Sequence, residues 1–291
     1  MVSGFSGSVP RPIAVFMYRN YVISRCLLAG ALLVALGGAG ALAQTPASPA
    51  AESPAAPAES PADAPAPASR PAHERLIAER LALSRFDVEM LWLDAADGPF
   101  LALHRPADAA VPFGGLVIVT TPGSSVDHAP VPHALSHVGP AGGWSVLSLQ
   151  PPPAGAGPEA TAARIVAAVA EFAGRGLENI VLVGDSGGVS GALAALNGTL
   201  PPGVIGFVGV GAWDADLAGV DVAVLDVAGT RDPRAMRWQE QRRARARTYP
   251  NSLEAVAIDG AGPDFYGYAT HTAKLIRGWL QRAAPAKIVS R

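Results

Sequence analysis

The segment from Asn179 to Ser190, Asn-Ile-Val-Leu-Val-Gly-Asp-Ser-Gly-Gly-Val-Ser, constrains the fold of this chain more than any other stretch. Residues 180–183 form a continuous apolar run, which is typical of a strand buried on both faces. The run stops at Gly-Asp-Ser-Gly-Gly, and residues 189–196 are rich in alanine and compatible with a helix. The segment therefore predicts a strand, a tight turn and a helix, in that order.

The turn has the pattern Gly-x-Ser-x-Gly with Ser186 at its centre. A serine held at a sharp strand-to-helix turn leaves little room for side chains two residues away, which explains Gly184 and Gly188. The unpaired N–H groups at the start of the helix favour negative charge that develops beside Ser186. The context is that of a nucleophile elbow, although the same string also suits an ordinary glycine-rich turn.

The N-terminal part of the chain has the composition of an export signal. Residues 1–43 contain three arginines, no acidic residue and an apolar run over 27–36. We interpret them as a secretory signal peptide cleaved before Gln44, with an apolar run too short for a membrane span. An uncleaved anchor is the alternative, and translation can start at Met1 or at Met17.

Composition narrows the possible functions of the remaining chain. The one cysteine, Cys26, lies inside the signal, so the mature protein can form no disulfide and no cysteine-based metal site. Loss of the three signal arginines takes the formal net charge from −2 to −5, which argues against nucleic-acid binding. Residues 44–72 are rich in proline and alanine and predict a disordered linker. Residues 73–291 then suit one domain, which we expect in the periplasm.

Strands and helices are expected to alternate through this domain. Nearly continuous apolar strands between helices predict a doubly wound, mostly parallel sheet, whose function lies at the carboxyl ends of the strands. An N-terminal helix over 73–85 and an antiparallel hairpin over 88–104 precede this alternation. Further strands are expected at 115–121, 144–149, 180–183, 204–210, 222–228 and 254–258, and further helices at 133–137, 159–175, 189–196, 234–247 and 270–282.

The order of these elements resembles the α/β-hydrolase superfamily. The elbow around Ser186 and the segment 225–233, which places Asp232 after a late strand, match the pattern of that superfamily. The resemblance covers about residues 73–283 and implies an α/β-hydrolase-like domain with an N-terminal antiparallel hairpin. Three stretches more narrowly resemble an exported bacterial branch, domain-of-unknown-function family 3530, namely 89–103, 143–149 and 276–280.

The superfamily implies a catalytic serine, acid and histidine in that chain order. Ser186 fits the nucleophile and Asp232 fits the acid. The histidine is expected in the loop after the last strand, where Pro263 stands instead, and proline has no ring nitrogen to accept a proton. His271 is the nearest replacement for the base, although its place in or beside a helix also suits an exposed side chain.

The superfamily also implies an oxyanion hole. Its first donor would be the backbone N–H of Gly187, and its second that of Gly123 or Ser124. The alternative is that residues 121–125 form only a strand-to-helix turn.

Three further histidines, His128, His133 and His137, follow the strand expected over 115–121. At least one of them can therefore line the crevice beside Ser186. The i, i+4 spacing of His133 and His137 also suits a metal site. No glutamate of the His-Glu-x-x-His kind accompanies them, so we predict neither a metal nor a cofactor.

Two features bear on the ligand. Only residues 211–220 separate two late strands, which leaves no room for a cap domain and predicts an open crevice suited to a polymeric ligand. A cluster of arginines follows Asp232 and suits either a solvated helix face or a surface for anionic lipid or polysaccharide. These arginines are Arg231, Arg234, Arg237, Arg242, Arg243, Arg245 and Arg247.

Two functions of different classes follow from the sequence. The first is an exported serine esterase with an atypical or incomplete triad. The second is a non-catalytic, envelope-associated binding domain on a hydrolase scaffold. The expected partner is an ester or an envelope polymer, with membrane contact only through an uncleaved signal. Fold alone does not decide between the two hypotheses.

Overall fold

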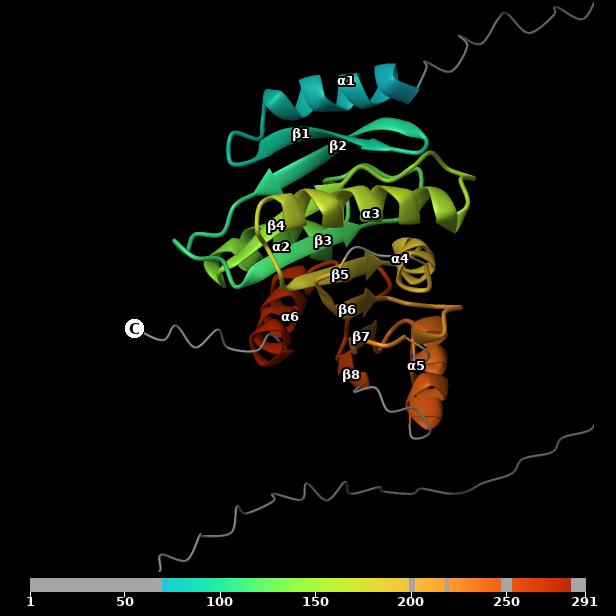
Figure 1. Ribbon diagram of the computed structural model, residues 1–291. Helices are drawn as coiled ribbons and strands as arrows, with labels where there is room; N and C mark the ends of the chain where they lie inside the picture. Colours follow the sequence, from blue (N-terminus) through green and yellow to red (C-terminus); the bar gives the residue numbers. More distant parts are fainter. Residues whose placement is uncertain (1–69, 199–201, 218–219, 247–252, 284–291) are drawn as a thin grey trace, which may run out of the picture. The chain divides into compact units, whose positions relative to one another are not determined.

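The protein is described from a computed structural model that covers residues 70–198, 202–217, 220–246 and 253–283 (Figure 1). The predicted signal peptide, 1–43, and all but the end of the predicted linker, 44–72, lie outside these described residues. The first helix, α1 (Arg70–Ala82), begins and ends three residues earlier than expected. None of the described helices has the length and apolar character needed to cross a membrane.

Within the described residues, eight strands form one sheet in the order β1-β2-β4-β3-β5-β6-β7-β8. β1 pairs antiparallel with β2, and β2 pairs antiparallel with β4. All later pairs are parallel, so the prediction of a mostly parallel sheet with an N-terminal hairpin is confirmed. The strands are β1 (Glu89–Ala95), β2 (Gly98–Arg105), β3 (Gly114–Val119), β4 (Trp144–Leu149), β5 (Ile180–Asp185), β6 (Val204–Val210), β7 (Ala223–Gly229) and β8 (Leu253–Ile258).

Helices cover both faces of the sheet because both faces of its strands are apolar (Figure 1). On β5, Leu182 packs with the side chains of α3 and α4, whereas Val181 and Val183 pack with those of α2 and α6. This alternation follows from the two-residue period of a strand. The helices after α1 are α2 (Pro130–Ala141), α3 (Pro158–Gly174), α4 (Gly188–Leu196), α5 (Pro233–Ala246) and α6 (Ala269–Ala283).

A buried ionic link joins α1 to the rest of the domain. Glu74 of α1 lies 3.0 Å from the guanidinium of Arg164 on α3 and accepts the backbone N–H of Leu101 at 2.6 Å. Arg164 also pairs with Asp97 at 3.0 Å, in the turn of the β1–β2 hairpin. Both Glu74 and Arg164 are buried, so α1 is fixed to the sheet and is part of the folded domain.

The topology creates one crevice at the carboxyl ends of the strands. The chain runs from β3 outward to β4 and then returns to β5, which lies on the other side of β3. In open parallel sheets, ligands bind where the strand order reverses in this way. The loops that follow β3 and β5, residues 120–129 and 186–187, therefore face the same crevice. Residues 211–222, between β6 and β7, are too few for a cap over it.

Candidate active site

Ser186 lies at the sharp turn between β5 and α4. Its φ angle is +50°, a conformation in which side chains other than glycine are uncommon. The backbone holds this turn from both sides, because Ser186 N–H donates to the Val210 carbonyl at 2.9 Å and Val189 N–H donates to the Ser186 carbonyl at 3.2 Å. The predicted strand, turn and helix are therefore present, with the serine at the turn.

The two glycines that flank the serine have no space for a side chain. A Cβ on Gly188 would lie 2.5 Å from the backbone oxygen of Val119, and one on Gly184 would lie 2.9 Å from Cα of Val189. Both distances are shorter than Cβ contacts in real proteins. The steric reason inferred from the sequence for these two positions agrees with this geometry.

Residues with unusual backbone conformations occur in several loops at this end of the sheet. Phe265, in the loop after β8, has φ +54°, and Asp214, in the loop after β6, has φ +57°. Ser186 Oγ and Phe265 both lie close to Gly211, within 3.7 Å of where its Cβ would be. Such conformations cost about 1–3 kcal/mol each and persist where surrounding structure enforces them, often at functional sites.

Ser186 opens into a pocket of about 680 Å³. Besides Ser186, residues from the loops after β3 and β8 line this pocket, together with the end of β5. They include Thr120, Thr121, Ser124, His128, Asp185, Pro263, Asp264 and Tyr266. The pocket therefore has the position expected from the topology, at the carboxyl ends of β3 and β5.

Asp185, the residue before the serine, has a carboxyl group with a strongly shifted pKa. It keeps a partly accessible face, but protein atoms surround it densely, and this burial raises the pKa of its carboxyl to about 7. A hydrogen bond with the Ser186 side chain opposes the rise in pKa without cancelling it. Sequence reasoning did not single out Asp185, although it lies inside the Gly-Asp-Ser-Gly-Gly pattern. Only the three-dimensional surroundings of its carboxyl reveal the shifted pKa.

The histidines considered as the base lie in different places. His128 lines the Ser186 pocket, whereas His271 is exposed on the first turn of α6 and is not among the residues that line it. Pro263, at the position expected for the superfamily histidine, also lines the pocket. The structure thus brings His128, rather than His271, to the crevice of the serine.

Asp232 has a structural role in addition to its predicted catalytic one. It is buried, and one carboxylate oxygen accepts the backbone N–H groups of Arg234 at 3.0 Å and Ala235 at 3.1 Å. These are donors of the first turn of α5, so Asp232 caps that helix. It does not line the Ser186 pocket.

The predicted oxyanion donors all have partners within the protein. Gly187 N–H donates to the Thr121 hydroxyl at 3.1 Å, Gly123 N–H to the Pro152 carbonyl at 2.7 Å, and Ser124 N–H to the Thr121 carbonyl at 3.0 Å. A substrate oxygen would first have to displace the Thr121 side chain from the Gly187 N–H. Thr121 is exposed and can rotate, so that N–H is the most readily freed of the three donors.

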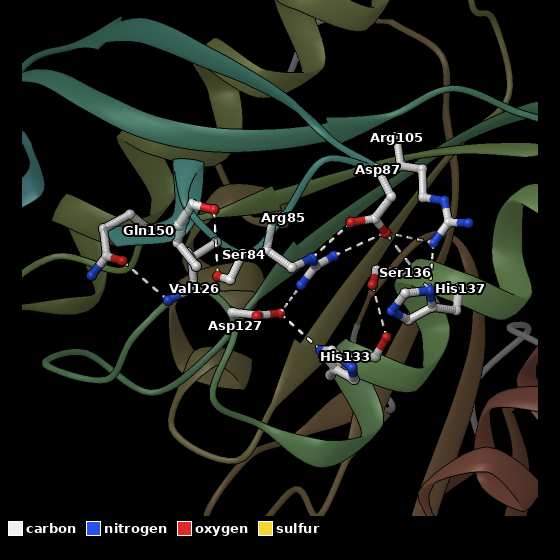
Figure 2. Close-up of polar contacts among 11 residues, drawn as sticks. Ser84, Arg85, Asp87, Arg105, Val126, Asp127, His133, Ser136, His137 and Gln150 are labelled. Carbon is white, nitrogen blue, oxygen red and sulfur yellow. Dashed lines mark hydrogen bonds and ion pairs between the residues drawn. The ribbon is translucent and has the colours of Figure 1, made fainter. Parts of the chain in front are cut away.

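Next to this pocket, six charged or imidazole side chains form a closed ring (Figure 2). The ring links the α1–β1 connection, the end of β2, the loop after β3 and α2. Two neighbouring histidines complete it, with ring centroids 4.9 Å apart. In order of contact its members are His137, Arg105, Asp87, Arg85, Asp127 and His133, at N–N or N–O distances of 2.5, 3.1, 2.9, 2.5 and 2.8 Å.

The histidine pair of this ring does not offer two metal ligands. Arg105 donates to Nδ1 of His137, so neutral His137 carries its proton on Nε2 and has no free lone pair. In the described part of the chain, no group of three or more His, Cys, Asp or Glu side chains is arranged to hold a metal ion. His133 and His137 instead line a second recess of about 570 Å³, which shares Pro130 and Tyr266 with the Ser186 pocket.

The ring predicts a pH dependence of stability. Burial, and next Arg105 and His133, lower the pKa of His137, although Asp87 opposes this. Below pH 6.5 the His137 imidazole therefore binds a proton more readily in the unfolded chain than in the folded chain. As a result, the free energy of unfolding falls as the pH drops from 7.5 to 5. The contribution is less than about 1 kcal/mol, because solvent screens a side chain that is 42% exposed.

Urea unfolding of wild type and His137→Gln at pH 7.5 and pH 5 would measure this contribution. We expect the wild type to lose more stability than the variant on acidification. Equal losses would contradict the assignment to His137.

The arginine cluster after Asp232 is not one solvated face, and the interpretation as such was wrong for Arg242. That side chain is buried and pairs with Asp226 of β7 at 2.8 Å. Arg243 donates to the Ala255 carbonyl at 2.6 Å, and only Arg245 of these three forms an exposed pair, with Asp216 at 3.2 Å. A helical periodicity of arginines does not by itself reveal which one faces the sheet.

The fold and the elbow at Ser186 define an α/β-hydrolase-like protein, and comparison with solved structures agrees. A dienelactone hydrolase from Anabaena variabilis is 18% identical with a TM-score of 0.57, and covers 68% of this chain and 100% of its own. An α/β serine hydrolase without a lid from Xanthomonas campestris is 19% identical with a TM-score of 0.55, covering 69% and 97%. An α/β serine hydrolase homologue from Coxiella burnetii is 17% identical with a TM-score of 0.55, covering 66% and 97%. At these identities the likeness establishes the fold alone.

One family model matches the N-terminal part of the chain. The family model described as "Protein of unknown function (DUF3530)" matches residues 26–163, which confirms that resemblance. No curated protein matches the chain in sequence. The matched range ends before Ser186, so it supports the resemblance and says nothing about the elbow.

Proposed function

We propose that the protein is an exported serine hydrolase that cleaves carboxylic esters, with Ser186 as its nucleophile. The observation that carries this proposal is the strained Ser186 turn, at φ +50°, opening into a pocket that also contains an acid with a pKa near neutrality. Strain at a serine and a strongly shifted pKa beside it are each more frequent at catalytic sites than elsewhere. The signal-like residues 1–43 support export.

The solved structures of similar fold support the same reaction class. Among them are a dienelactone hydrolase, an α/β serine hydrolase without a lid and a thermostable carboxylesterase, which are all hydrolases. We propose an ester as the bond cleaved because a serine nucleophile acts by accepting an acyl group, and an ester is a common acyl donor. The open pocket and the adjoining recess beside His133 and His137 suit an ester on an extended or polymeric ligand.

A second candidate is a non-catalytic binding domain of the cell envelope. Pro263 stands where the superfamily histidine is expected, and the Gly187 N–H is occupied by the Thr121 hydroxyl. On this hypothesis the crevice binds an envelope polymer without cleaving it. The two candidates make opposite predictions for the reactivity of Ser186.

Fluorophosphonate labelling of the full-length protein tests the proposal, with turnover of a short p-nitrophenyl ester measured in parallel. We expect labelling and turnover in the wild type and neither in Ser186→Ala. A folded wild type that is neither labelled nor active would contradict the hydrolase and favour the binding domain. Circular dichroism of both proteins controls for folding.

A further inference from the structure

The proposed nucleophile needs a group that accepts its proton. A serine hydroxyl is a weak nucleophile by itself, and a general base typically contributes 10²- to 10⁴-fold in rate. The loop after β8 offers Pro263 in place of a histidine, and His271 is exposed on α6 outside the pocket. The base must therefore come from another element of the crevice.

Asp185 lies beside the serine that needs the base. The two residues are consecutive in the chain and line the same pocket, and the Ser186 side chain influences the pKa of the Asp185 carboxyl. Because Asp185 ends β5, the hydrogen-bonded ladder of the sheet fixes its backbone, with a partner at Val210 of β6. A base on a strand end is held more firmly than one on a loop.

We propose that Asp185 is the general base of Ser186 and takes the role that histidine has in the superfamily. This inference rests on the proposed esterase function. It gives the elbow sequence Gly-Asp-Ser-Gly-Gly a chemical reason, since the acid and the nucleophile are adjacent in the chain.

The acidity of Asp185 suits this role. An ordinary aspartate, with a pKa of 3.8, holds a proton too weakly to be an effective base, but burial raises the pKa of Asp185 to about 7. This value is close to that of imidazole, and general bases work best when their pKa lies near the operating pH. At neutral pH the group is divided between its two forms, so it can accept a proton in one step and return it in the next.

The proposed reaction balances with water as the only co-substrate. Ser186 Oγ attacks the ester carbonyl carbon while its proton passes to the Asp185 carboxylate, and the carbonyl electron pair moves onto oxygen. When the tetrahedral intermediate collapses, the alkoxide leaves with the proton from Asp185 as an alcohol, and an acyl-serine remains. Water then attacks the acyl group, giving its proton to Asp185. The second collapse returns that proton to Ser186 and releases the carboxylic acid.

His128 is the competing base, because it lines the same pocket. The pH–rate profile of the wild type alone does not identify which of the two groups is the base. Variants of each residue separate the two candidate bases. Asp185→Asn removes the basic carboxylate and keeps the shape of the side chain, whereas His128→Gln removes the imidazole.

We expect kcat/KM for a short p-nitrophenyl ester to fall 10²- to 10⁴-fold in Asp185→Asn of the full-length protein. The rise in activity with pH through about 7 should disappear in this variant. His128→Gln should keep that rise. Asp259→Asn is the matched control, because it removes a negative charge from an exposed aspartate after β8 that does not line the pocket.

Chemical rescue distinguishes a base from a residue that only maintains the structure, because an added carboxylate can replace a missing base but not a missing structural contact. Added formate, a small carboxylate, should restore part of the turnover of Asp185→Ala and none of that of Ser186→Ala. A folded Asp185→Asn with wild-type kcat/KM, or loss of the pH dependence in His128→Gln alone, would overturn the inference and leave the hydrolase intact. A wild type without turnover dependent on Ser186 would overturn the proposed function itself.

Discussion

Arg242→Met is expected to lower the free energy of unfolding by about 3–5 kcal/mol at pH 7, a large share of the stability of a single domain. Arg242 is 1% exposed and Asp226 is 0% exposed. The guanidinium holds both carboxylate oxygens of Asp226, at 2.8 and 2.9 Å. Without Arg242, the Asp226 carboxylate would be a buried charge that has lost its paired cation. Removing one partner in this way destabilises a protein more than replacing both partners by apolar side chains.

The loss should depend on pH in a defined direction. Burial raises the pKa of Asp226 even with Arg242 in place, and removal of Arg242 removes an interaction that lowers it. The folded variant would then hold a proton over a pH range in which the unfolded chain, with a pKa near 3.8, has lost it. A group with a raised folded pKa loses stability as the pH rises, so the deficit of the variant should be larger at pH 8 than at pH 5.

Urea unfolding at both pH values measures this effect, and two further variants isolate it. Arg245→Met removes an arginine whose ion pair with Asp216 is exposed, and it should cost about 0–1 kcal/mol. The double variant Asp226→Leu with Arg242→Met replaces the pair by apolar side chains and should recover most of the loss. A cost for Arg242→Met as small as that for Arg245→Met would contradict the account.

Arg242 also connects stability to the crevice. Its guanidinium donates to the carbonyls of Ala212 at 3.0 Å and Ala215 at 3.2 Å, in the loop after β6. That loop begins at Gly211, which lies beside the Ser186 hydroxyl. We therefore infer that the buried ion pair holds the loop after β6, next to Ser186, as well as α5.

The fold could be predicted from the sequence because its signals are local. Apolar runs such as 204–210 and 144–149 coincide with β6 and β4, and the remaining strand ends differ by at most two residues. The helix expected over 133–137 proved longer, because α2 begins at Pro130, where proline is well tolerated in the first turn. Pro140, inside that helix, did not end it.

The site could be predicted only where the chain itself encodes it. The Gly-x-Ser-x-Gly spacing identified the turn at Ser186, because the steric demand lies within five residues. The partners of that serine depend on contacts between distant segments, such as Gly187 with Thr121. Neither the shifted pKa of Asp185 nor the burial of Arg242 follows from the residues that adjoin them in the chain.

Gly188→Ala is expected to cost about 3 kcal/mol of unfolding free energy, at the upper end of the range for overpacking. The added Cβ would lie 2.5 Å from the Val119 oxygen and 2.9 Å from the Thr120 oxygen, both of them backbone atoms of the neighbouring segment. Replacing glycine by alanine in a helix gains at most about 1 kcal/mol, so the clash decides the sign. Because β3 and α4 must separate to relieve it, the Ser186 turn should move and fluorophosphonate labelling should be lost.

Gly187→Ala is the matched control, one residue earlier in the same turn. Its Cβ would meet the Thr121 side chain at 2.9 Å, and that exposed side chain can rotate away where the backbone of β3 cannot. We therefore expect a cost below about 1.5 kcal/mol for Gly187→Ala, as for other changes that the surroundings absorb. Thermal and urea unfolding of the two variants, with labelling of each, measures the difference. Equal stabilities would mean that β3 yields to the added methyl group, and that the elbow does not require glycine at position 188.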